Sequence, residues 1–154
     1  MSGPRLAARE DIPALVSLMA EFYEEAGFLL PVDPAARSFA QLIDDPRLGA
    51  IWLLEEDGAA VGYLVVTFGF SMEFGGTRAF VDDFFVRPSF RGKGLGAAAL
   101  KTVRKECSDH GVRALLVETG PDDHPARALY AREGFEASGR VLLTQPLAPP
   151  VHEL

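Results

Sequence analysis

The sequence predicts a single α/β domain in which helices flank a mixed central β-sheet, and three observations lead to this prediction. Its 154 residues, of which 48% are hydrophobic and 24% charged, suit one compact domain with one core. β-rich runs separated by short turns fill residues 51–86, which is typical of an antiparallel meander. From residue 95 onward, helical periodicity alternates with β-rich runs, as in a β-α-β crossover. The predicted order is β-α-α-β-β-β-α-β-α-β.

Two helices are predicted in the first third of the chain. Apolar residues recur at helical spacing from Ile12 to about Glu25, with Asp11 as the expected cap and Gly27 after the end. A shorter helix is expected over residues 34–43, because proline at its start is tolerated and Pro46 stops it.

The predicted meander has strands over residues 51–54, 61–68 and 79–86. The turn at residues 55–58 joins the first two strands into an antiparallel hairpin, because it ends in Asp-Gly. We expect the third strand, which ends at Arg87-Pro88, to be the central strand of the sheet.

The remaining elements complete the crossover. They are a helix over residues 95–109 stopped by a glycine, a buried strand over 114–117, a helix over 125–133 and a short last strand over 141–144. Residues 1–147 thus form one predicted domain, and the proline-rich residues 148–154 a flexible tail.

The composition narrows the classes of partner. Fifteen basic residues against 22 acidic ones give a net charge of −7, which argues against binding to nucleic acid or to an anionic membrane surface. No apolar run approaches the roughly 20 residues of a membrane helix, and we identify no export signal, so a cytoplasmic protein is expected. A single cysteine, Cys107, and three dispersed histidines favour neither a disulfide nor a metal site, and we assign no role to His152.

One segment reverses the overall charge. Residues 87–105 contain six basic side chains and no acidic one, and they include the loop Arg91-Gly92-Lys93-Gly94-Leu95-Gly96 between a predicted strand and a predicted helix. Backbone N–H groups and the positive end of the helix meet there, which favours an anion. The spacing fits neither a P-loop nor a dinucleotide fingerprint. The last three basic residues of the segment also fit an ordinary solvated helix face.

The loop matches the pattern R-x-x-G-x-G, and with F-F-V-R-P before it and A-R-A-L-Y-A-R-E-G-F at residues 126–135 the chain resembles the GCN5-related N-acetyltransferase (GNAT) superfamily. The run V-D-D-F-F-V-R-P-S-F-R-G-K-G is closest in motif to the diamine acetyltransferase-like branch. The resemblance implies acetyl-coenzyme A as co-substrate and a strand splayed from residues 115–117. It also implies that backbone groups bind the pantetheine arm and pyrophosphate, at Phe84, Phe85, Val86 and Arg91 through Gly96, with Asp123 and Ala126 nearby.

Acetyl transfer to an ammonium needs a proton acceptor for the amine and a donor for the departing thiolate. The resemblance implies that Tyr130 is the donor. Asp82 and Asp83 stand in mid-strand, where an unpaired carboxylate is costly, so one of them is expected to serve function. Strict alternation sends them to opposite faces. We choose Asp82, as a direct base, a base acting through water or an anchor for the ammonium, and expect Asp83 to form a salt bridge or a loop hydrogen bond beneath the site.

Substrate binding is expected at Asp82 together with Tyr23 and Glu24 at the end of the first helix, where Glu25 adds further negative charge. An acidic helix end is also common on an ordinary solvated surface. The prediction is therefore an N-acetyltransferase that works by direct attack of a small cationic amine, a diamine or lysine-like amino acid, on acetyl-coenzyme A. The alternatives are a peptide or protein N-acetyltransferase and a noncatalytic acetyl-coenzyme A sensor. The resemblance also suggests a homodimer.

Overall fold

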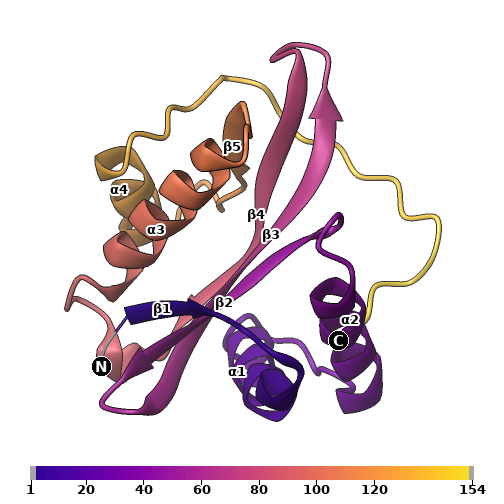
Figure 1. Cartoon of the computed structure of the whole chain (residues 1–154), viewed down its shortest axis with the longest axis vertical. Helices are drawn as coiled ribbons and strands as arrows, with labels where there is room; N and C mark the ends of the chain where they lie inside the picture. The colour runs from indigo at the N-terminus through magenta and orange to yellow at the C-terminus, as the bar shows by residue number, and fades with distance from the viewer. Residues whose placement is uncertain (1–2, 153–154) are drawn as a thin grey trace.

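The computed structural model describes residues 3–152 as one five-stranded sheet with helices on both faces (Figure 1). The elements, in chain order, are β1 (Gly3–Leu6), α1 (Ile12–Glu25), α2 (Val32–Asp44), β2 (Gly49–Glu56), β3 (Ala59–Ser71), β4 (Gly76–Val86), α3 (Leu95–Asp109), β5 (Ala114–Val117) and α4 (His124–Arg132). Short 3-10 turns precede α1 at Arg9–Asp11 and follow β4 at Pro88–Phe90. Every helix predicted from periodicity is confirmed.

The sheet order is β1-β2-β3-β4-β5, with antiparallel neighbours up to β4 and a parallel pair between β4 and β5. The hairpin predicted over residues 51–68 is confirmed. The central strand is β3, not the strand over 79–86, because β1 pairs with β2 and moves the middle of the sheet one strand away. β4 instead lies between the meander and the single parallel strand.

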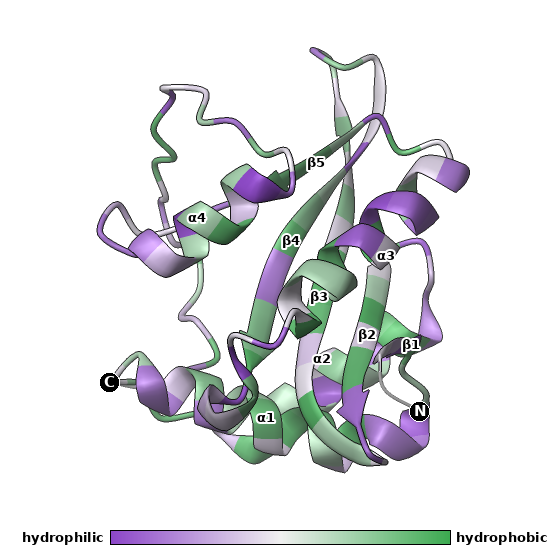
Figure 2. Cartoon of the chain, turned by 90° about the vertical axis from the view of Figure 1, so that its left-hand side faces the viewer, coloured by the Kyte–Doolittle hydropathy of each residue, from purple (hydrophilic) through white to green (hydrophobic). Residues whose placement is uncertain are grey.

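Two apolar layers hold the fold together. The first packs α1 and α2 on one face of the sheet, through side chains such as Leu15, Phe39 and Phe85. The second packs α3 on the other face, where Leu100, Val103 and Cys107 are buried, and α4 adds partly buried side chains to it. Figure 2 shows the apolar strands between these helices. Residues that alternate along β2 and β3 therefore reach different cores.

Two local predictions were wrong. Asp11 does not cap α1: its carboxylate accepts the Ala8 N–H at 2.7 Å and the Arg5 guanidinium at 2.8 Å, because the 3-10 turn occupies the entrance to the helix. The last strand over residues 141–144 is also absent. β propensity gives no strand without a partner for its backbone groups, and Arg140 instead forms an ion pair with Glu73 at the end of the β3–β4 hairpin, at 2.9 Å.

Beyond α4 the chain has no helix or strand up to residue 152, and it crosses the molecule toward α1 and α2 (Figure 1). The His152 ring lies against Phe28, with ring centroids 4.1 Å apart, and near Tyr23. The predicted tail over 148–154 ends at two residues that lie outside the described part. No helix within residues 3–152 has the length and apolarity to cross a membrane.

Candidate active site

The parallel pair β4–β5 separates before β4 ends, which opens one edge of β4. Pairing runs from Arg78 opposite Ala114 to Val81 opposite Val117, whereas β4 continues to Val86. Figure 2 shows β5 beside only one end of β4. Within residues 3–152, no strand therefore pairs with the backbone N–H and C=O groups on this edge of β4 beyond Val81.

Alternation along β4 decides which backbone groups face this open edge. The Arg87 N–H donates to the Val61 carbonyl of β3 at 2.8 Å. Because neighbouring residues of a strand direct their N–H and C=O groups to opposite sides, Phe85 also faces β3, and Phe84 and Val86 face the open edge. Of the three residues expected to offer backbone groups to an extended ligand, only Phe84 and Val86 thus direct them to the open edge. The Phe85 ring packs in the α1 core against Phe22, with ring centroids 5.4 Å apart.

A β-bulge changes the predicted arrangement of the two aspartates. Val66 pairs with Val81 and Val65 with Asp83, so Asp82 is an extra residue in β4. The bulge reverses the alternation beyond it, and Asp83 joins the face that carries Tyr63 and Phe85. The strict alternation on which the predicted separation of the two carboxylates rested is therefore interrupted, and the charge of Asp82 raises the pKa of Asp83.

Asp83 and its surroundings form a half-buried polar cluster. The hydroxyl of the fully buried Tyr63 donates a hydrogen bond to Asp83 Oδ2 at 2.8 Å. The pKa of Asp83 is raised to about 7, because burial raises it most strongly, the Tyr63 hydrogen bond partly opposes this increase, and the charge of Asp82 adds to it. Asp83 thus forms a hydrogen bond with a residue of β3, and not the expected salt bridge or loop hydrogen bond. Burial and the charges of Asp83 and Asp82 raise the pKa of Tyr23 to about 12, which brings a predicted substrate residue into the same cluster.

A cleft of about 210 Å³ lies where β4 and β5 separate. Its lining combines β4, the segment after β5 and α4, together with one residue of α1, and comprises Phe22, Val81, Asp82, Phe84, Val117, Glu118, Thr119, Gly120, Asp123, Ala126 and Tyr130. The two predicted catalytic residues, Asp82 and Tyr130, therefore lie in one cleft although 48 positions separate them in the sequence. Asp82 is solvent-accessible there, and partial desolvation raises the pKa of its carboxyl group.

Tyr130 is a half-buried residue of α4 between two aromatic rings. Its ring centroid lies 5.5 Å from that of Phe135 and 6.5 Å from that of Phe84. Burial, with a smaller contribution from the charge of Asp123, raises the pKa of Tyr130 to about 12. Asp123 accepts the Ala126 N–H at 3.2 Å and so caps α4, as expected for an aspartate at this position. The phenol thus stays protonated at neutral pH.

The glycine loop leads directly into α3. Gly92 and Gly94 adopt φ values of +76° and +84°, a left-handed conformation that favours glycine, and Gly94 is the residue before the helix. The first helical hydrogen bond joins Ala98 N–H to Gly94 C=O, so three N–H groups precede it at the positive end of the helix. Gly96 serves packing, because a Cβ there would lie 3.3 Å from Leu129 and 3.4 Å from Phe84.

The basic side chains of the loop lie apart from these N–H groups. Arg91 Nε donates to the Val86 carbonyl at 2.8 Å, and its guanidinium forms an ion pair with Glu25 of α1 at 2.8 Å. Lys93 lies over the Phe90 ring, 5.1 Å from its centroid. Arg91 therefore links the loop to α1 in this structure, and the anion cradle is formed by the backbone.

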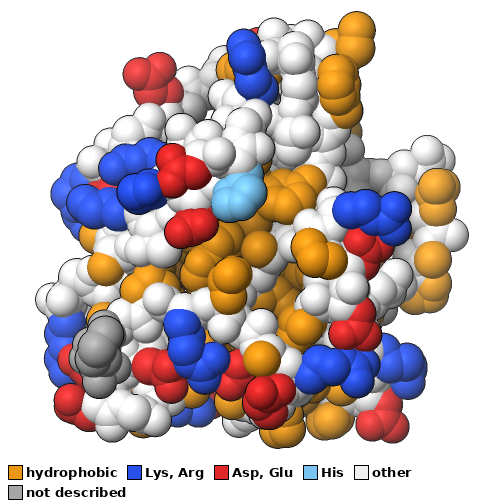
Figure 3. Space-filling model, viewed as in Figure 1, with side chains coloured by type: hydrophobic (Ala, Val, Ile, Leu, Met, Phe, Trp, Pro, Cys, Tyr) orange, Lys and Arg blue, Asp and Glu red, His pale blue; other side chains and the backbone are white. Residues whose placement is uncertain are grey.

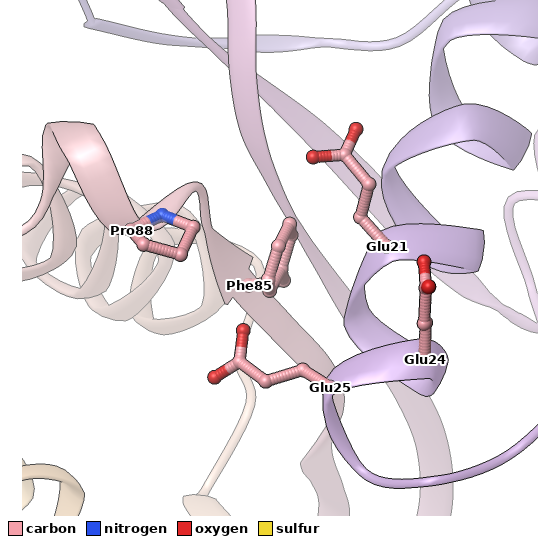
Figure 4. Close-up of a pocket in the computed structure, with 5 residues that line it drawn as sticks. All are labelled: Glu21, Glu24, Glu25, Phe85 and Pro88. Carbon is pink, nitrogen blue, oxygen red and sulfur yellow. The ribbon is translucent and has the colours of Figure 1, made fainter.

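Figure 4 shows a second hollow, between α1 and the end of β4. Three glutamates of α1 line it with Phe85 and Pro88. Glu21 pairs with Arg87 at 2.7 Å and Glu25 with Arg91, whereas within residues 3–152 Glu24 has no ion pair. Sequence reasoning selected Glu24 and Glu25 and missed Glu21, whose helical spacing of four residues from Glu25 places both on one face.

The described residues fit a coenzyme A thioester. The open edge of β4 offers backbone groups to an extended amide chain, and the cradle at α3 offers N–H groups to a diphosphate. Residues 3–152 bring no three His, Cys, Asp or Glu side chains together in a way that suits a metal ion. The fold thus suits a domain that binds an acyl-coenzyme A, and its cleft holds a carboxylate and a phenol.

The model of the Acetyltransferase (GNAT) family matches residues 12–135, and the chain belongs to this family. An aminoglycoside N(6')-acetyltransferase type 1 from Stenotrophomonas maltophilia is 28% identical over 92% of this chain and 94% of its own length. An L-2,4-diaminobutyric acid acetyltransferase from Nocardia farcinica is 31% identical over 68% of this chain and 54% of its own.

Solved structures agree with this assignment. An integron cassette protein from the mobile metagenome of Cole Harbour Salt Marsh is 60% identical, with a TM-score of 0.89 over 96% of this chain and 92% of its own. The aminoglycoside N-acetyltransferase AAC(6')-Iy in complex with CoA is 18% identical, with a TM-score of 0.82 over 96% of each chain, and shares the fold. The protein is an acetyl-CoA-dependent N-acetyltransferase of the GNAT type.

Proposed function

We propose that this N-acetyltransferase acetylates a primary amine of a small cationic molecule, a diamine or a lysine-like amino acid. The observation that carries the proposal is the cleft in which Asp82 of the β4 bulge and Tyr130 of α4 lie together. Asp83 lies on the α1 face of β4, and three glutamates at the end of α1 add further acidic groups. The names of the aminoglycoside and diaminobutyric acid acetyltransferases above describe substrates with several amino groups, which supports this substrate class.

Asp82 and Tyr130 each carry out one proton transfer of the reaction. The substrate ammonium loses a proton to Asp82, directly or through water, and the amine nitrogen then attacks the carbonyl carbon of the thioester. The new C–N bond forms as the C–S bond breaks, and Tyr130 Oη donates its proton to the departing thiolate. The attacking nitrogen releases its second proton to water, which leaves a neutral amide, and Tyr130 regains a proton from water, so the overall reaction releases one proton. Tyr130 suits this role because its raised pKa keeps the proton in place until negative charge develops on sulfur.

A thiol-release assay with acetyl-CoA tests the substrate class. The acceptor panel contains diamines, lysine-like amino acids, aminoglycosides and short peptides, with reactions lacking acceptor as controls. We expect saturable turnover with a small diamine. Turnover with peptides alone would contradict the proposal and favour the peptide N-acetyltransferase, whereas tight acetyl-CoA binding without any turnover would favour a sensor.

The variant Asp82→Asn tests the residue assignment in the same assay. We expect kcat/KM for the diamine to fall by roughly 10- to 100-fold, because a carboxylate that pairs with an ammonium is replaced by a neutral amide. Asp33→Asn is the matched control, since Asp33 is an exposed aspartate of α2 outside the cleft. An equal effect of both substitutions would assign the loss to net charge and not to Asp82.

A further inference from the structure

Tyr63 and Asp83 form a pair of polar side chains in a part of the core that apolar side chains could fill. Tyr63 is buried in the centre of the sheet, and its hydroxyl is directed at the carboxylate of Asp83. The register that pairs Val65 with Asp83 and Tyr63 with Phe85 places both polar groups on the α1 face, among apolar side chains. Each group satisfies the other, since a buried hydroxyl needs an acceptor and a buried carboxylate needs a donor.

No cation balances the two carboxylates. The titratable groups that face Asp83 are Tyr63 of β3, Tyr23 of α1 and Asp82 of β4. Within residues 3–152, the ion pairs of the molecule involve other acids, and no arginine, lysine or histidine pairs with Asp82 or Asp83. Two neighbouring carboxylates in such surroundings do not ionise together readily, and the more buried one keeps its proton longer.

We propose that Asp83 and Tyr63 form a proton-holding pair that sets the charge of the acceptor site. While Asp83 holds its proton, the site carries the single negative charge of Asp82. When the O–H bond of Asp83 breaks and the proton leaves to water, the site carries two negative charges and binds an ammonium more tightly. This inference rests on the proposed function, and Asp83 acts in it as a positioning residue through Asp82.

Because Asp83 and Tyr63 share a hydrogen bond, substitution of each residue is expected to change the pH dependence of the reaction in a different way. The pKa of Asp83 is raised to about 7, mainly by burial, and the Tyr63 hydrogen bond limits this increase. In the wild type, kcat/KM for a diamine is expected to fall by roughly tenfold as pH decreases through 7 and then to reach a plateau. A tenfold fall corresponds to a loss of about 1.4 kcal/mol in the binding free energy of the ammonium. Asp83→Asn removes this step. Tyr63→Phe moves it to higher pH, because the charged carboxylate loses its donor.

A merely structural role predicts a different pattern. Loss of packing would lower kcat/KM evenly across the pH range in both variants and leave the step in place. A step that persists near pH 7 in Asp83→Asn would therefore overturn the proposal. Circular dichroism and the affinity for coenzyme A establish that each variant is folded, and Asp83→Asn alone decides the question if Tyr63→Phe does not fold.

A second measurement separates this inference from the proposed function. The carboxyl carbons of aspartate, labelled with carbon-13, are titrated by NMR in the absence of any substrate, and the resonance missing in Asp83→Asn identifies Asp83. A midpoint near pH 7 supports the proton-holding pair even if no small amine is acetylated. A midpoint below pH 5 overturns it even if a diamine proves to be the substrate.

Discussion

Tyr130 shows how a single residue acquires a chemical role from its surroundings. Tyr130 lines the cleft together with Asp82, while its ring packs between Phe135 and Phe84. An apolar environment disfavours the phenolate and so keeps the proton on the oxygen. The raised pKa follows from the packing, and the packing follows from the position of α4 against β4.

We expect Tyr130→Phe to lower kcat by about 100-fold or more, because general acid catalysis commonly contributes 10²–10⁴ in rate. Coenzyme A affinity, measured by calorimetry, should change little, since the ring remains. Because the pKa of Tyr130 is about 12, its ionisation should cause no loss of wild-type kcat below pH 10. Unchanged kcat in the variant would show that another group protonates the thiolate.

Some residues have a structural role that their local position explains, and others depend on partners distant in the sequence. Cys107 is buried against the sheet from α3, and Asp123 caps α4. Tyr63 was missed, although a tyrosine in an apolar run and an aspartate in another are signals of a buried hydroxyl–carboxylate pair. Only the register between β3 and β4 joins the two.

At the scale of elements, the glycine loop presents backbone N–H groups where it joins α3, and we expect these groups, and not its side chains, to bind the cofactor. Gly94 holds a left-handed conformation immediately before the helix, with open space around it. A side chain would therefore meet no neighbour there, and only the dihedral angle would be strained. The shape of the cradle thus depends on one backbone position.

We expect Gly94→Ala to weaken coenzyme A binding by roughly tenfold, because strain of about 1–2 kcal/mol favours a rearranged loop. Gly111→Ala is the matched control. Gly111 follows the other end of α3, has φ +80°, and a Cβ added to it would meet no atom within 4 Å. Both variants should lower the thermal midpoint similarly. Equal affinities for coenzyme A in the two variants, measured by calorimetry, would contradict a binding role for the loop.

At the scale of the whole molecule, Asp83 links stability to pH. Its pKa of about 7 in the folded state lies above its ordinary value of 3.8. Between these values the folded protein holds more protons than the unfolded chain, so the free energy of unfolding decreases as pH rises. This contribution is complete below pH 3.8, and it is lost once pH has risen through 7.

We therefore expect wild-type protein to lose up to roughly 4 kcal/mol of stability from this group as pH rises from 4 to 8. Asp83→Asn should lack that decrease and be more stable than wild type at pH 8. Urea denaturation across this pH range provides the measurement. A parallel pH dependence in both proteins would show that Asp83 ionises at an ordinary pH.

The segment after α4 bears on association between molecules. Val141, Leu142 and Leu143 are 80%, 61% and 88% exposed, and Figure 3 shows hydrophobic side chains along this segment and at the end of the β3–β4 hairpin. Exposed apolar side chains in sequence often mark a contact surface. We expect a homodimer by light scattering that the double substitution Leu142→Asp and Leu143→Asp converts to monomer. A monomeric wild type would contradict this expectation.

The sequence by itself predicted the four helices, the strands β2 to β5 and the glycine loop, and it selected Tyr130 and Asp82 as candidates, because periodicity, turn residues and motif spacing are properties of adjacent residues. The tertiary structure decided the bulge at Asp82, the separation of β4 from β5, the Asp83–Tyr63 hydrogen bond and the absence of the last strand. Each of these depends on pairing between segments distant in the chain. The type of a residue and its neighbours in the sequence indicate which chemical roles it can have. The register of its strand determines which side chain it contacts.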